Sequence, residues 1–166
     1  FLSRHFDKVF ALEPSTKHFN NLSLLINGCV INEGGKFIEI DPLPNVTIIK
    51  KAIFMENGKF QFGGPKDNTT MRSLHMATWA EGKPEEKVEA ITPEKLFEDY
   101  KIEHVNLMKL DVEGSEIEIL SHPTFKKVAD KIDTILVENH TWNNRPPNQL
   151  KEALKNAGCS VEQIPN

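Results

Sequence analysis

Apolar residues along the chain fall into two alternating patterns. A short continuous apolar run, such as residues 9–12, is typical of a strand that is buried on both faces in a parallel sheet. Apolar positions at helical spacing follow that run, with Ser15 placed to cap the helix and Gly28 placed to end it. The predicted inward face of this helix consists of Phe19, Leu22, Leu25 and Ile26. A strand followed by a helix indicates one α/β unit.

The same alternation predicts the other elements. After a loop rich in Gly and Pro, further buried strands are expected over residues 46–54, 105–110 and 132–137. Helices are expected over residues 93–100, with Thr92 as the cap, and over 115–120, 123–129 and 146–157. The tight turn at residues 56–59 predicts a small hairpin with residues 60–62. Residues 63–91 indicate an insertion of short strands, and a last strand is expected near Val161.

Strands that alternate with helices predict the fold class. Right-handed crossovers between such strands give an open, doubly wound, mostly parallel sheet of the Rossmann-like α/β type, here as a single domain over residues 1–166 with a β-hairpin insertion. Ligands of these folds bind beyond the carboxyl ends of the strands. The informative residues are therefore those that directly follow a predicted strand.

Glu13 follows the first predicted strand. A carboxylate at a strand end can accept hydrogen bonds from both hydroxyls of a ribose, which is a common way to bind a nucleoside. The alternative is an exposed carboxylate without a ligand.

Three carboxylates, Asp111, Glu113 and Glu116, lie where the strand over 105–110 passes into a helix. Acidic side chains at a helix start interact favourably with the helix dipole, which accounts for Glu116 and equally for Glu113. This explanation fits Asp111 less well, because the last position of a buried strand directs a carboxylate into the ligand crevice. A divalent cation is an alternative occupant, but the sequence does not define the remaining ligands, and no metal is expected.

His140 ends the next predicted strand and is expected to lie beside Asp111 at the same edge of a parallel sheet. A histidine in that place can act as a general base near neutral pH, or it can be a structural hydrogen-bonding residue. Trp79, His75 and Met76 in the predicted insertion either line an acceptor pocket or pack in the core of the hairpins.

Composition narrows the classes of function. The chain has 166 residues, of which 39% are hydrophobic and 27% charged, as expected for a folded globular protein. A net charge of −4 provides no basic field for nucleic acid, and no apolar run approaches the roughly 20 residues of a membrane span. Two cysteines form neither a disulfide framework nor a four-ligand zinc site, which favours a reduced, cytoplasmic protein.

Three blocks of the sequence resemble the FkbM-type methyltransferases. The first is Val-Phe-Ala-Leu-Glu-Pro-Ser over residues 9–15, followed by Phe19, Leu22, Asn27 and residues 46–52. The second, Met-Lys-Leu-Asp-Val-Glu-Gly-Ser-Glu-Ile-Glu-Ile-Leu over residues 108–120, is similar to the most distinctive block of that family. The third is Ile-Leu-Val-Glu-Asn-His over residues 135–140. The resemblance implies a class I, S-adenosylmethionine-dependent methyltransferase that methylates a hydroxyl of a sugar or natural product.

The resemblance also implies roles for individual residues. Glu13 and Asp111 are expected to bind the methyl donor, and Asp111, Glu113 and His140 are expected on the side of a small-molecule or glycan acceptor. Asp111 or His140 takes the proton of the acceptor hydroxyl, and Glu113 either positions that hydroxyl or serves only the helix start.

Two parts of the family's fold are expected to lie outside the sequence. The family holds its donor with a Gly-containing loop after the first strand, and residues 1–6 resemble the tail of the helix that follows this loop. The closing hairpin would follow Gly158. The 166-residue chain is therefore expected to be truncated at both ends, to bind S-adenosylmethionine weakly and to self-associate through an open strand edge. A non-catalytic nucleoside-binding module and an enzyme that uses a nucleotide sugar or NAD are the alternatives.

Overall fold

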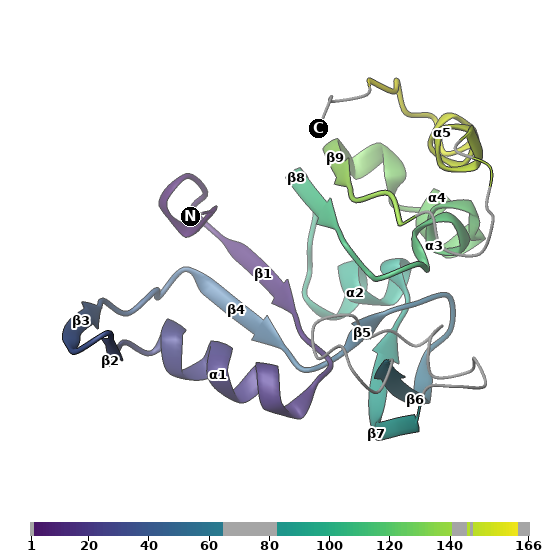
Figure 1. Ribbon diagram of the computed structural model, residues 1–166. Coiled ribbons are helices and arrows are strands. Elements are labelled where there is room, and N and C mark those ends of the chain that lie inside the picture. The colour runs from purple at the N-terminus through teal and green to yellow at the C-terminus, as the bar shows by residue number, and fades with distance from the viewer. Residues whose placement is uncertain (1, 65–82, 141–145, 147, 163–166) are drawn as a thin grey trace. The chain divides into compact units, whose positions relative to one another are not determined.

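The computed structural model describes residues 2–64, 83–140, 146 and 148–162 (Figure 1). The chain divides into two compact units, Phe1–Ala52 and Ile53–Asn166, and each is described by itself.

The first unit contains a parallel pair of strands and one long helix. Its elements, in chain order, are the 3-10 helix η1 (Leu2–Arg4), β1 (Val9–Leu12), α1 (Thr16–Ile26), β2 (Cys29–Glu33), β3 (Lys36–Ile40) and β4 (Val46–Ile49). β1 pairs in parallel with β4, from Val9 opposite Val46 to Leu12 opposite Ile49. Helix α1 lies between these strands in the sequence and packs along β4 (Figure 1). The predicted strand-helix-strand unit is therefore present. On α1, Leu25 is exposed rather than inward, so the predicted helix face is wrong at that position.

The segment between α1 and β4 is a hairpin and not the expected loop. β2 and β3 pair antiparallel, and the chain reverses at Gly34 and Gly35, which both have positive φ. The hairpin has no buried face, since Val30 is 62% and Phe37 77% exposed. Its residues consequently lack the alternation of buried apolar and exposed polar positions by which a strand is recognised.

The strand predicted over residues 46–54 is interrupted at Lys50. β4 ends at Ile49, and the short strand β5 (Ala52–Ile53) joins a different sheet, which has the order β5-β7-β6. In that sheet β6 (Gly58–Gly64) pairs antiparallel with β7 (Lys83–Ile91). The predicted hairpin partner of residues 60–62 is therefore wrong, because β7 lies between β5 and β6. Gly63 and Gly64 are the end of β6.

The second unit contains a second parallel pair. Beyond β6 and β7, its elements are α2 (Pro93–Asp99), β8 (Val105–Leu110), α3 (Glu116–Ser121), α4 (Pro123–Lys126), the 3-10 helix η3 (Ala129–Lys131), β9 (Ile132–Val137) and α5 (Asn148–Asn156). β8 and β9 pair in parallel at the positions predicted from the sequence, with Leu110 opposite Val137. Helices α3 and α5 contact each other beside this pair (Figure 1).

A buried cluster fixes the position of the β8 end. Leu110, the last residue of β8, is almost fully buried together with Ile119 and Leu120 of α3 and Phe125 of α4. Burying such side chains contributes roughly 1.5–3 kcal/mol each. The carboxyl end of β8 and the start of α3 are thereby held against one core.

Several predicted boundaries differ from the structure. The helix expected over 123–129 ends at Lys126, because the chain changes to the 3-10 turn η3 before β9. Residues 161–162, the described part of the expected last strand, form no strand. The described residues form a mixed α/β fold of small sheets, and one continuous doubly wound sheet is not seen among them. None of the described helices has the length and apolarity needed to cross a bilayer.

Candidate functional site

The carboxyl ends of β8 and β9 bring together the acidic residues that follow them. Asp111 directly follows β8 and Glu138 directly follows β9, and the parallel register places these two residues side by side. The ladder continues one step past the strands, because the Glu138 N–H donates to the Leu110 carbonyl over 3.1 Å. Both side chains therefore stand at one edge of the pair.

Backbone N–H groups of the turn between β8 and α3 donate hydrogen bonds to a single carboxylate oxygen, Oε1 of Glu116. Glu113 has a φ of 54° and Gly114 a φ of 104°, and a positive φ is costly for a residue that has a Cβ atom. Oε1 of Glu116 accepts the backbone N–H of Val112 over 3.2 Å and that of Gly114 over 3.1 Å. Glu116 begins α3 and is only 3% exposed. The buried Glu116 thus stabilises the turn that presents Glu113.

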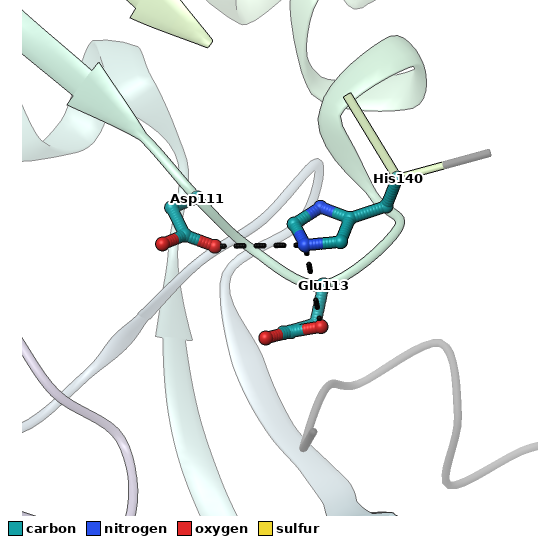
Figure 2. A group of neighbouring side chains, drawn as sticks. All are labelled: Asp111, Glu113 and His140. Carbon is teal, nitrogen blue, oxygen red and sulfur yellow. Dashed lines mark ion pairs between the residues drawn. The ribbon is translucent and has the colours of Figure 1, made fainter. Parts of the chain in front are cut away.

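His140 lies at the centre of these carboxylates and its side chain is 10% exposed. Its Nδ1 is 2.7 Å from Oε1 of Glu116. Its Nε2 is 3.4 Å from Oε2 of Glu113, 3.8 Å from Oε1 of Glu138 and 3.9 Å from Oδ1 of Asp111. Figure 2 shows the ring between Asp111 and Glu113. We call Asp111, Glu113, Glu116, Glu138 and His140 the carboxylate–histidine cluster.

One lysine faces this cluster. Nζ of Lys109 is 2.7 Å from Oδ2 of Asp111 and 3.7 Å from Oε2 of Glu138. The hydrogen bond to Asp111 is the main cause that raises the pKa of Lys109. Four carboxylates against one lysine and one imidazole leave an excess of negative charge among these residues, which favours a positively charged group beside them.

Glu113 has the least satisfied carboxylate of the cluster. Its Oε2 is buried and accepts no hydrogen bond from the described residues, although Nε2 of His140 lies 3.4 Å away. Burial raises the pKa of Glu113, and the charge of His140 opposes that rise. A buried oxygen without a donor is rare in folded proteins and is an expected feature of a site where a ligand supplies the missing hydrogen.

Three members of the cluster also have the geometry of a ligand set. One ligand atom from each of Asp111, Glu113 and His140 can be chosen so that all lie within 4.8 Å of one another. Carboxylate and imidazole groups are ligands of divalent cations, so these are the described residues that could hold a metal ion.

Glu13 follows β1 and is engaged locally. Its Oε1 accepts the backbone N–H of Ser15 over 2.8 Å, and its Oε2 provides a second acceptor. Ser15 is the N-cap residue of α1, but its side chain makes no capping hydrogen bond, so the predicted side-chain cap is wrong. The Ser15 hydroxyl is buried and has no hydrogen-bond partner among the described residues. The carboxylate of Glu13, and not the Ser15 hydroxyl, satisfies an amide at this helix start.

The structure brings together Asp111 and His140, as the strand order predicted, and places Glu113 beside them, whereas Glu13 lies in the other unit. The sequence reasoning missed two partners, Glu116 and Lys109. A glutamate at a helix start is usually explained by the helix dipole, and only its distance from His140 distinguishes Glu116. Trp79, His75 and Met76 lie outside the described residues.

The sequence matches one family model. The model of the methyltransferase FkbM domain matches residues 7–158 and so includes both strand ends described above. No curated protein and no solved structure matches the chain.

Proposed function

Because the chain belongs to the FkbM methyltransferase family, we propose that it transfers a methyl group from S-adenosylmethionine to a hydroxyl oxygen of a sugar or natural product. The observation that carries this proposal is the position of His140, whose Nε2 is surrounded by carboxylates at the carboxyl edge of a parallel strand pair.

The residues present fit a nucleoside donor with a positive charge. S-adenosylmethionine, when bound, supplies an electrophilic methyl group on a positively charged sulfur. Oε2 of Glu13 is available as an acceptor for a ribose hydroxyl, while Oε1 is held by the Ser15 amide and fixes the carboxylate. The buried, unpartnered hydroxyl of Ser15 is a further polar group of the kind a ligand satisfies. Asp111, in the carboxylate–histidine cluster, is the second residue that we propose to bind the methyl donor.

His140 is the better candidate for the general base. When Nε2 takes the proton of an acceptor hydroxyl, the ring becomes positively charged, and the carboxylates of Asp111, Glu113 and Glu138 within 3.9 Å stabilise that charge. Asp111 is less suited, because its Oδ2 is already bonded to the ammonium group of Lys109. Glu113 is proposed to position the acceptor through Oε2, which has no donor among the described residues and would accept a hydrogen from a second donor group of the acceptor, because the one hydrogen of the reacting hydroxyl goes to Nε2.

Both units are proposed to form one methyltransferase domain with a Rossmann-like, doubly wound sheet. Each unit contributes one parallel pair, and parallel pairs occur almost only in α/β folds whose faces are covered by helices. The family match extends from the first unit far into the second, which supports a single domain.

Titration calorimetry of the natural full-length chain with S-adenosylhomocysteine and with NAD tests the donor. Binding of S-adenosylhomocysteine but not of NAD supports the proposal, and the reverse assigns the site to a dinucleotide enzyme. The acceptor is tested with methyl-tritiated S-adenosylmethionine and a panel of methyl glycosides. Donor binding without methyl transfer to any hydroxylated compound would favour a nucleoside-binding module without catalysis.

A further inference from the structure

We propose that Glu116 is a positioning residue that holds His140 with a hydrogen on Nδ1 and directs its Nε2 lone pair to the carboxyl edge of the strands. The catalytic consequence rests on the proposed function, whereas the protonation pattern of the ring does not.

The hydrogen-bond inventory determines the direction of the contact between these residues. Oε1 of Glu116 already accepts two backbone N–H groups, from Val112 and Gly114. An oxygen that accepts two hydrogens in this way is the unprotonated oxygen of the carboxylate. The 2.7 Å contact with Nδ1 of His140 is therefore a hydrogen bond in which Nδ1 donates. In the neutral ring, the lone pair is then on Nε2.

The burial of Glu116 indicates that it does more than interact favourably with the dipole of α3. A glutamate that only interacts with a helix start stays in water, because burying a carboxylate is costly unless several hydrogen bonds compensate it. The Glu116 side chain is 4% exposed, and within the described part of the chain three hydrogen bonds reach its Oε1. Glu118 supplies a second acidic side chain to the first turn of α3, so the helix start does not depend on Glu116 alone.

The same oxygen also connects two segments that are distant in the sequence. It holds the amides on both sides of Glu113, and it holds the ring of His140, which is 24 residues further along than Glu116. The separation of Glu113 Oε2 from His140 Nε2 is therefore set largely through Glu116. A geometry fixed in this way lowers the reorganisation needed when Nε2 accepts a proton.

Nitrogen-15 NMR of the histidine-labelled full-length protein tests the protonation pattern directly. In the neutral ring of the wild type, we expect hydrogen on Nδ1 and none on Nε2. Glu116→Met keeps the volume of the side chain but removes the acceptor, so the hydrogen should redistribute between the two nitrogens. Glu116→Gln keeps an oxygen that can accept all three hydrogens, and we expect it to retain the wild-type pattern.

The kinetic readout separates positioning from folding. Glu116→Met should lower kcat by about 10–100-fold, the usual effect of losing a residue that orients a functional histidine, with donor affinity little changed. Glu116→Gln should recover most of the rate. Glu118→Met, a matched change in the same helical turn, should have neither effect, and thermal unfolding of all variants reports their stability.

The wild-type spectrum alone can overturn the proposal, even where a variant fails to fold. Hydrogen on Nε2 with a bare Nδ1 would show that Glu116 does not orient the ring in this way. A ring protonated on both nitrogens throughout the pH range of activity would leave no lone pair on Nε2 and would also contradict it. A protein with the expected pattern but no methyl transfer would support the positioning and overturn the proposed function instead.

Discussion

Two strand ends carry an acidic residue, and they use it in different ways. Glu13 follows β1 and Asp111 follows β8, and each of these strands belongs to a parallel pair. The carboxylate of Glu13 bonds an amide of its own chain, two residues further on. Asp111 instead meets His140, which follows another strand. A carboxylate at a strand end can thus bond within its own segment or join a cluster with residues that follow a neighbouring strand.

The residues that follow the neighbouring strands also differ. β4, the partner of β1, is followed by Lys50 and Lys51, whereas β9, the partner of β8, ends at Val137 and is followed by Glu138 and, two residues later, His140. The Leu110–Val137 register aligns these last residues, and the buried core behind Leu110 holds the alignment. In the proposed function, the first strand end provides one carboxylate for the donor and the second provides the group that accepts a proton.

The largest expected effect is on His140. His140→Ala should lower the rate of methyl transfer by about 10²–10⁴-fold, as is typical when a general base is lost. Asp111→Asn should lower it by less than about tenfold, because the carboxylate mainly bonds Lys109 and stabilises the charged ring from 3.9 Å. Single-turnover rates at saturating donor measure both. If Asp111→Asn is the more damaging change, Asp111 is the base.

Glu13 should affect donor affinity and leave the chemical step nearly unchanged. Removing a hydrogen-bonding carboxylate costs about 1–3 kcal/mol, so Glu13→Ala should weaken S-adenosylhomocysteine binding by about 5–150-fold. Glu39→Ala, which removes an exposed carboxylate from β3 of the same unit, is the control. An unchanged dissociation constant for Glu13→Ala would leave Glu13 with only its role at the start of α1.

The carboxyl ends of β8 and β9 were predicted correctly from the sequence, but the β2–β3 hairpin and the contacts of Glu116 were not. β8 and β9 are found at the predicted residues, with Leu110 and Ile132 buried in the core, and the proximity of Asp111 and His140 follows from parallel pairing. The side chains of the β2–β3 hairpin, such as Phe37, are exposed and show no core-facing pattern, but Gly34-Gly35 between two short runs is a hairpin signal that could have located it. The environment of Glu116 was missed because it depends on a contact with a residue 24 positions away, which local sequence does not encode.

Glu113, at the carboxyl end of β8, should make the free energy of unfolding depend on pH. Burial raises its pKa in the folded state, so its contribution to stability is complete below the ordinary value of about 4.3 and is lost as the pH rises through the folded-state pKa. At neutral pH the charged Glu113 therefore lowers the free energy of unfolding. Glu113→Gln should be more stable than the wild type near pH 8, and the gain should vanish near pH 4.

Urea unfolding at both pH values measures this difference. Glu138→Gln is a matched control, since Glu138 contacts His140 as well but its side chain is 56% exposed. The control should show a smaller dependence on pH. A loss of stability in Glu113→Gln near pH 8 would mean that attraction to His140 outweighs the cost of burial.

The smallest expected effect compares the helix starts of the two units. Thr92 caps α2 by accepting the N–H of Lys95 over 3.2 Å, so Thr92→Ala should cost about 1 kcal/mol of unfolding free energy. The Ser15 hydroxyl makes no such bond, and Glu13 accepts the amide at that helix start instead. Ser15→Ala should therefore change stability by less than about 0.5 kcal/mol, in the direction of stabilisation, because a buried hydroxyl without a partner is itself unfavourable. If Ser15→Ala costs as much as Thr92→Ala, the hydroxyl has a partner in the folded protein. If it is neutral for stability but weakens donor binding, the hydroxyl acts with Glu13 in holding the ligand.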